Sequence, residues 1–236
     1  MSDGTLATGL PGGSHEDAER EERSAVASLV NRTHTIEVHE ASPSRVVDPG
    51  FNAILLRACA DLAVLAEELG MADVAAENRG FAKRGLAALE SLWSEAHGQY
   101  LCHDRVSGRL IDSPSVGGLL AVFAAVPQVR AAAIARRIEG LGCRFIVPSH
   151  DPSDARFDAQ RYWRGPVWLV VNRMIADGLR AAGEDATASA ITRASLDLIS
   201  AGGFAEYYDP LSGAPLGGGR FTWTAAMVLE FLAEAA

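Results

Sequence analysis

The chain has 236 residues, enough for one large domain or two small ones with a sizeable buried core. Asp and Glu number 30 against 21 Lys and Arg, a net charge of −9, and such a negative field argues against nucleic acid or an anionic membrane surface as a partner. No run of residues approaches the roughly 18 to 20 apolar residues of a membrane span. The start lacks the basic and apolar stretches of a signal peptide, so we expect a cytoplasmic protein.

The cysteines Cys59, Cys102 and Cys143 are widely spaced, and no pair has the spacing of zinc ligands. We therefore expect reduced thiols and neither a metal site nor a cofactor. The tripeptide Cys102-His103-Asp104 contains residue types of a nucleophilic site. However, adjacent side chains point in different directions, and a catalytic Cys and His normally meet through the fold, so we do not interpret this tripeptide as catalytic.

Residues 1–45 are rich in Gly, Ser, Glu and Arg with little periodic apolar content, which predicts a poorly ordered N-terminal arm. A helix is predicted from Asp48-Pro49 to Gly70. Its expected apolar face follows i, i+3, i+4, i+7 spacing and comprises Phe51, Ile54, Leu55, Ala58, Leu62, Leu65, Ala66 and Leu69. A second helix, from Asp73 toward Trp93, completes an antiparallel hairpin.

The same design recurs along the chain. A helix is predicted for 170–182, a turn for 183–185 and a return helix for 186–200, and a third hairpin is predicted between Val116 and Gly142. The loops after the first and last hairpins are similar in sequence. Repeated units of paired helices predict an all-α toroid or solenoid, with its connecting loops gathered at one end.

Aromatic residues are concentrated in two loops of the last third. The first is Tyr162-Trp163-Arg164-Gly165-Pro166-Val167-Trp168, and the second is Glu206-Tyr207-Tyr208-Asp209-Pro210. Flat aromatic faces suit the apolar side of a pyranose ring, while Arg and Glu suit its hydroxyls and its reacting carbon. Pro166 is predicted to lie in the first turn of the following helix, which would place Trp163 and Arg164 at the positive end of that helix.

These two motifs, together with Phe51-Asn52-Ala53-Ile54-Leu55 and Phe221-Thr222-Trp223-Thr224-Ala225-Ala226, form an ordered set. In residues 46–236 this set resembles the C-terminal half of a glycoside hydrolase family 63 catalytic domain, with bacterial mannosylglycerate and glucosylglycerate hydrolases as the most similar members. The resemblance implies an (α/α)6 toroid, here partial, that binds a sugar at its loop-rich mouth. It also implies an inverting reaction with two carboxylic acids roughly 6.5 to 9.5 Å apart.

The resemblance also implies roles for individual residues. Glu206 takes the position of the general base, Trp163 and Arg164 line the sugar site, and Trp223 forms the opposite wall. Tyr162 and Tyr208 are further substrate-binding candidates, while Trp168 is expected to serve the core more than the site. Because the glycerate members have a carboxylate on the leaving group, Arg164 is the residue best suited to grip it by a bidentate bond.

The family's general-acid aspartate lies in an upstream Trp-Asp motif, and this chain has no tryptophan before Trp93. Three hypotheses therefore stand. The first is an inverting glycosidase acting on a small α-glycoside such as glucosylglycerate or mannosylglycerate, and the second is a truncated, catalytically inactive sugar-binding or interaction module lacking the acid. The third is a truncated product that folds poorly, whose exposed helix faces favour self-association. Arg164 has a second interpretation as well, as a structural ion-pair partner of Asp158 or Glu206.

Overall fold

The computed structural model describes residues 41–42 and 45–234. The chain divides into two units, residues 1–45 and 46–236. Most of the predicted N-terminal arm therefore lies outside the described residues. All helices and hairpins named below belong to the second unit.

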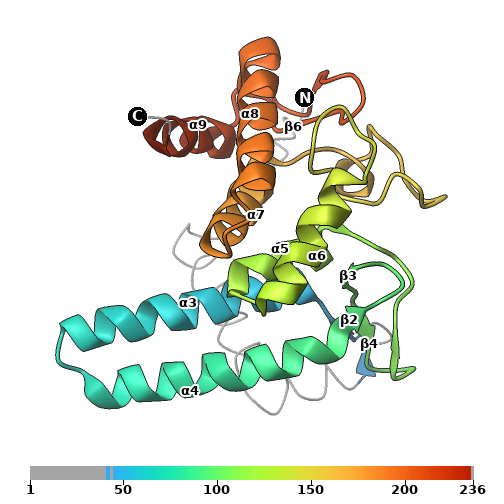
Figure 1. Cartoon of the computed structure of the whole chain (residues 1–236). Helices are drawn as coiled ribbons and strands as arrows, with labels where there is room; N and C mark the ends of the chain where they lie inside the picture. The colour runs from blue at the N-terminus through green and yellow to red at the C-terminus, as the bar shows by residue number, and fades with distance from the viewer. Residues whose placement is uncertain (1–40, 43–44, 235–236) are drawn as a thin grey trace, which may run out of the picture. The chain divides into compact units, whose positions relative to one another are not determined.

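Antiparallel helices joined by short β-hairpins make up the second unit (Figure 1). Its described α-helices are α3 (Pro49–Glu68), α4 (Ala72–Leu89), α5 (Val116–Leu120), α6 (Gln128–Glu139), α7 (Leu169–Ala181), α8 (Asp185–Gly202) and α9 (Thr222–Glu234). Its 3-10 turns are η1 (Glu90–Leu92), η2 (Ala121–Ala124) and η3 (Tyr162–Arg164). The all-α prediction is confirmed, and the first and last predicted hairpins are the helix pairs α3–α4 and α7–α8. Between Val116 and Gly142 the chain forms the short helix α5, the turn η2 and then α6.

The strands are two residues long and pair antiparallel. They are β1 (Val46–Val47), β2 (Trp93–Ser94), β3 (Gln99–Tyr100), β4 (His103–Asp104), β5 (Arg109–Leu110), β6 (Tyr207–Tyr208) and β7 (Pro215–Leu216). Their orders are β1-β4-β5, β2-β3 and β6-β7. The loops that look alike in sequence, after α4 and after α8, each place a fully buried tyrosine in a short strand, Tyr100 in β3 and Tyr208 in β6. This correspondence supports the internal repeat.

Helix α3 begins and ends as its sequence predicts. The Asp48 carboxylate accepts a hydrogen bond of 2.7 Å from the Phe51 N–H, Pro49 occupies the first turn, and Gly70 adopts a positive φ of 71° after the last turn. The predicted apolar face, however, is wrong except at Ala66. Phe51 is 75% exposed and Leu69 is 74% exposed, whereas the residues that face the core are Pro49, Gly50, Ala53, Leu56, Ala63 and Ala66.

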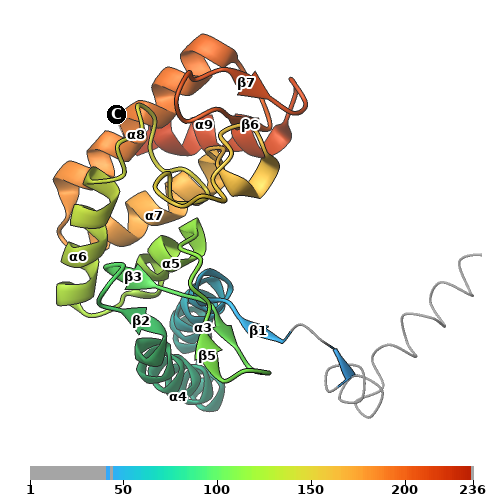
Figure 2. The ribbon, with the colours of Figure 1, turned by 90° about the vertical axis from the view of Figure 1, so that its right-hand side faces the viewer.

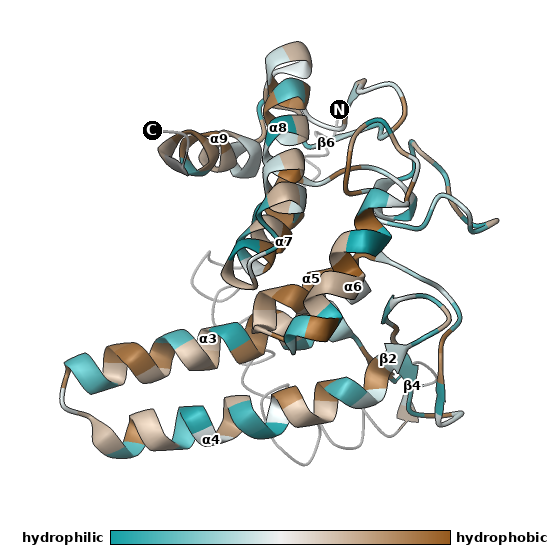
Figure 3. Cartoon of the chain, viewed as in Figure 1, coloured by the Kyte–Doolittle hydropathy of each residue, from teal (hydrophilic) through white to brown (hydrophobic). Residues whose placement is uncertain are grey.

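The buried face of α3 is made largely of small residues because α4 packs closely against it. A Cβ atom added at Gly85 of α4 would lie 2.2 Å from a methyl carbon of Leu56, so this crossing requires glycine. Apart from Leu56, the larger apolar side chains of α3 are exposed, and Figure 3 shows that hydrophobic residues occur along the length of this helix. Amphipathic spacing therefore located the helix but not the face that packs.

Helix α3 also has the length and apolar composition of a membrane-crossing helix. The sequence-based expectation that no segment reaches those limits is wrong for this helix. Core helices meet the same criterion, and α3 packs along α4 and against η2.

Buried Asn172 on α7 links three parts of the second unit. Its amide oxygen accepts from the Val147 N–H at 3.0 Å, and its amide nitrogen donates to the Ile146 carbonyl and to Ser195 Oγ, each at 2.9 Å. Because every polar atom of this side chain is paired, a polar residue is accommodated in the core. The segment before α7 is thereby tied to α7 and α8.

Helix α7 begins one residue before its predicted range of 170–182, but the prediction that places Pro166 in its first turn is wrong. Its first residue is Leu169, and Trp168 occupies the N-cap position, so Pro166 lies outside the first turn. The backbone of Val167 instead exchanges hydrogen bonds with Tyr208, at 2.8 and 3.1 Å. Pairing with Tyr208 keeps this segment extended, and the loop that leads into α7 therefore runs beside β6 (Figure 2).

Candidate active site

Four aromatic rings from the two predicted loops form one cluster. Trp163 stacks on Trp168 with ring centroids 4.2 Å apart and 4° between the planes. Tyr207 stacks on Trp168 at 4.9 Å, and Tyr162 meets Trp163, Trp168 and Tyr207 edge to face. Stacked and edge-to-face pairs are the favourable arrangements of aromatic rings, so the two loops are held together by this cluster.

The two tryptophans have different environments. Trp168 is buried and donates its indole N–H to the Tyr162 carbonyl at 3.2 Å, whereas Trp163 remains 43% exposed. Trp168 is thus a core residue that supports Trp163, and Trp163 is an aromatic surface available to a ligand. Tyr162 is half exposed and has a positive φ of 40°, a conformation that a residue with a side chain adopts only at a local cost.

Tyr208 does not join the cluster. Its side chain is fully buried, and its hydroxyl donates to the Gly203 carbonyl and accepts from the Ala205 N–H. Burial raises the pKa of this hydroxyl. The structure therefore places Tyr208 in the core, where its ring is enclosed by protein.

Tyr207 takes the cluster position instead. Side chains alternate between the two faces of a strand, so only one tyrosine of the pair in β6 can face the other loop. Tyr100, which occupies the matching position in the similar loop after α4, is also fully buried, in agreement with a core position for Tyr208.

Glu206 lies directly before β6 and is partly exposed. The Gly218 N–H points at its carboxylate at 3.5 Å, the long limit of a hydrogen bond. The carboxylate lies so close to Gly217 that a Cβ atom there would be 2.6 Å from Glu206 Oε2. The β6-β7 hairpin therefore confines this carboxylate while leaving it accessible.

Helix α9 is attached to the same loop. Thr224 Oγ1 donates to the Ala205 carbonyl at 2.6 Å, so this residue links α9 to the backbone next to Glu206. Trp223 is 56% exposed, and its described ring contact is with Phe221, at 5.5 Å. Trp223 is thus a separate exposed aromatic residue on the element that adjoins Glu206.

Three aspartates build the loop that carries Trp163 and Arg164. Asp151, Asp154 and Asp158 each accept the N–H two residues ahead, at 2.8, 2.8 and 3.1 Å. This is the Asx-turn pattern, in which a side chain substitutes for a backbone turn. These acids therefore have structural roles.

Arg164 has a partner that its sequence did not suggest. Its Nε and one terminal nitrogen donate to the Arg156 carbonyl at 3.0 and 2.8 Å. Its described side-chain contacts thus go to a backbone oxygen and not to the carboxylates of Asp158 or Glu206. One terminal nitrogen of the exposed guanidinium is left for another acceptor.

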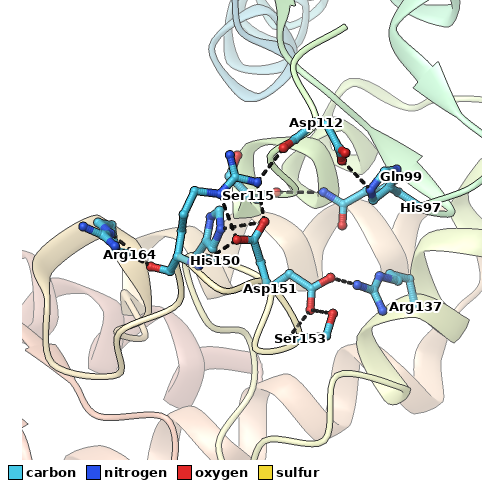
Figure 4. Close-up of polar contacts among 11 residues, drawn as sticks. His97, Gln99, Asp112, Ser115, Arg137, His150, Asp151, Ser153 and Arg164 are labelled. Atoms are coloured by element: carbon cyan, nitrogen blue, oxygen red, sulfur yellow. Dashed lines mark hydrogen bonds and ion pairs between the residues drawn. The ribbon is translucent and has the colours of Figure 1, made fainter.

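A polar network lies behind this loop (Figure 4). The Arg156 guanidinium binds the Asp154 carboxylate and the Asp112 carbonyl, and His150 Nε2 lies 3.5 Å from Asp154, an electrostatic contact too poorly aligned to count as a hydrogen bond. The hydrogen bonds from Arg156 hold the pKa of Asp154 well below its usual range, and burial lowers the pKa of His150. Arg137 of α6 pairs with the buried Asp151.

A groove of about 840 Å³ borders this network and is lined by Trp93, His97, Arg136, Arg137 and Arg156 among others. None of the six predicted site residues lines it. Within the described ranges, no group of three or more His, Cys, Asp or Glu side chains is arranged to hold a metal ion.

Residues 2–224 match the family model described as the mannosylglycerate hydrolase MGH1-like glycoside hydrolase domain. The matched region includes residues 2–45, which the sequence analysis left outside the resemblance. The chain is 43% identical over 195 residues to a mannosylglycerate hydrolase of Thermus thermophilus, an alignment that covers 81% of this chain and 46% of that protein.

Among solved structures, mannosylglycerate hydrolases of family 63 also match this chain. A crystal structure of the family 63 mannosylglycerate hydrolase from Thermus thermophilus in complex with glucose superposes with a TM-score of 0.81 at 39% identity, covering 94% of this chain and 53% of that one. The structure in complex with Tris and D-glycerate has a TM-score of 0.80 at 37% identity and covers 96% of this chain and 59% of that one.

The chain therefore spans about half the length of the relatives that it matches. Its helical hairpins are a part of the α/α toroid of those proteins. On the match of the family model to most of its length and on these structural neighbours, the chain belongs to the MGH1-like glycoside hydrolase domains of glycoside hydrolase family 63.

Proposed function

We propose that this chain supplies the general base and one sugar-binding wall of an inverting glycosidase that acts on mannosylglycerate or glucosylglycerate. Glu206 removes a proton from the attacking water, and Trp163, Tyr162 and Trp223 offer aromatic surfaces to the sugar. The observation that carries the proposal is the pairing of a confined, accessible carboxylate with an exposed tryptophan on two loops joined by one aromatic cluster.

The ligands of the solved relatives are consistent with this assignment. The Thermus thermophilus enzyme was crystallised with glucose and with D-glycerate, the two kinds of moiety that such a substrate joins. In our proposal the remaining guanidinium nitrogen of Arg164 binds the glycerate carboxylate. Tyr208 is omitted from the substrate contacts because its side chain is enclosed in the core.

The general acid is not assigned to any acid of the neighbouring loop. Asp151, Asp154 and Asp158 are engaged in turns, and the low pKa of Asp154 would leave it without the proton that an acid must donate. A complete inverting site therefore needs a second carboxylic acid other than these three, across the sugar from Glu206.

The test is the release of free hexose from mannosylglycerate and glucosylglycerate by the wild-type chain, by Glu206→Gln and by Glu77→Gln. Glu77 is an exposed residue of α4 and serves as the matched control. We expect release by the wild type and the control but not by Glu206→Gln. Absence of release by a folded wild type would overturn the claim of turnover, and sugar binding without release would favour the inactive sugar-binding module.

A further inference from the structure

We propose that Arg156 is a positioning residue that sets the orientation of Arg164. This inference deepens the proposed function, since it concerns the side chain assigned there to the leaving-group carboxylate. Arg156 has two sets of contacts. Its guanidinium binds Asp154 in the polar network behind the loop, and its carbonyl accepts both hydrogen bonds from Arg164.

Hydrogen bonds to Asp154 and Asp112 fix the side chain of Arg156. Its Nε donates to Asp154 Oδ1 at 2.8 Å, a terminal nitrogen donates to Asp154 Oδ2 and to the Asp112 carbonyl, and its own N–H donates to Asp154 Oδ1 at 2.8 Å. A planar guanidinium that binds a carboxylate with two nitrogens has little rotational freedom. The Asp154 side chain is 10% exposed and that of Arg156 is 51% exposed, so solvent reaches the pair from the arginine side and the fixed geometry matters more than the charge.

The carbonyl of Arg156 restrains the side chain of Arg164. Arg164 is exposed, and a free arginine side chain on the surface samples many rotamers. Because Nε and one terminal nitrogen of Arg164 both donate to the Arg156 carbonyl oxygen, the plane of the Arg164 guanidinium is fixed. The position of this carbonyl depends in turn on the anchored turn at 154–156. Arg156 therefore fixes the direction in which the remaining nitrogen of Arg164 points.

A chemical consequence distinguishes this role from general support of the fold. The Trp163 ring rests on Trp168 and does not depend on Arg156. Loss of the Arg156 guanidinium should therefore affect recognition of a carboxylate and spare recognition of the neutral sugar ring. A lysine at position 156 keeps a charge near Asp154, but one ammonium group cannot reproduce the planar two-nitrogen contact, so it should restore the function only in part.

The experiment compares the wild type, Arg156→Ala, Arg156→Lys, Arg164→Lys and the double variant Arg156→Ala/Arg164→Lys. Arg161→Ala is the control, because Arg161 is an exposed arginine of the same loop. The first measurement uses no ligand: the solvent exchange of the Arg164 Nε–H, followed by ¹⁵N NMR and assigned by its loss in Arg164→Lys. We expect a protected signal in the wild type and in Arg161→Ala, and fast exchange in Arg156→Ala.

The second measurement is calorimetric binding of mannosylglycerate, with methyl α-mannoside as the neutral probe. We expect Arg156→Ala to weaken mannosylglycerate binding about tenfold and to leave methyl α-mannoside binding unchanged, with a smaller loss in Arg156→Lys. The double variant should bind no more weakly than Arg164→Lys, because the two residues act as one unit. An unchanged Arg164 signal in folded Arg156→Ala would overturn the inference. Equal wild-type affinity for the charged and neutral probes would instead overturn the carboxylate role of Arg164, and the exchange measurement would still decide whether Arg156 positions it.

Discussion

Replacement of Gly217 by alanine gives a sharp test of the role of Glu206, because it displaces the carboxylate without changing it. Gly217 has a positive φ of 70°, and a Cβ atom added there would lie 2.6 Å from Glu206 Oε2, 2.8 Å from Glu206 Cβ and 2.9 Å from Tyr207 Cε1. Contacts below 3.0 Å are not tolerated, so either Glu206 or the β6-β7 hairpin must move.

The size of the effect follows from two terms. A residue with a side chain in the left-handed conformation costs roughly 1–2 kcal/mol, which sets the expected loss of folding stability. A displacement of a catalytic group by about 1 Å costs on the order of 100-fold in rate. Because Gly217 touches Glu206 and Tyr207 but belongs to a short exposed hairpin, we expect activity to fall much further than stability.

The assay is hexose release from mannosylglycerate, together with urea denaturation of the same preparations. Gly218→Ala and Gly219→Ala are the matched controls, since nothing lies within 4 Å of a Cβ atom at either position and neither has a positive φ. We expect near wild-type turnover in the controls and about a 100-fold loss in Gly217→Ala. Wild-type turnover in a folded Gly217→Ala variant would show that catalysis does not depend on where Glu206 lies.

Three further predictions concern other parts of the molecule. Trp163→Ala should weaken sugar binding about tenfold with little change in stability, whereas Trp168→Ala should lower the free energy of unfolding by about 3–5 kcal/mol; equal stability losses in the two variants would contradict their assigned environments. Asn172→Leu should cost about 3 kcal/mol or more in urea denaturation, because it leaves buried backbone groups unpaired, and a smaller loss would mean that water replaces the amide. Burial lowers the pKa of His150, despite the opposing charge of Asp154. Stability should therefore be full above the ordinary value of 6.5 and fall as the pH drops toward the lowered value; His150→Gln should flatten this part of a pH profile of urea denaturation, and an unchanged slope would assign the titration to another group.

The helical hairpins could be predicted from the sequence because their determinants are local. Asp48 and Pro49 start α3, Gly70 ends it, and periodic apolar residues follow in between. The similar loop sequences also indicated an internal repeat, and each loop does place a buried tyrosine, Tyr100 or Tyr208, in a short strand. Capping residues and hydrophobic periodicity can be recognised without knowing which element packs against the helix.

Other features depend on long-range packing and could not be predicted. The face of α3 that packs is decided by the close approach of Gly85, which an apolar count cannot show. The exclusion of Pro166 from the first turn of α7 is decided by backbone pairing of Val167 with Tyr208, some forty residues away in sequence. The partner of Arg164 is a backbone carbonyl, and residue identity carries no signal for such an acceptor.

The sugar-binding wall formed by Trp163, Arg164 and Glu206 is held by local contacts, whereas hydrolysis also requires a general acid. Trp168 lies beneath Trp163, the Arg156 carbonyl holds Arg164, and Gly217 adjoins Glu206, all through contacts within the second unit. The aromatic and basic parts of the wall should therefore keep their geometry whatever covers the exposed face of α3. Turnover has a different requirement, because protonation of the leaving oxygen needs an acid that the neighbouring aspartates do not provide. Binding assays thus test the wall that this chain carries, while turnover assays test whether the second acid is present as well.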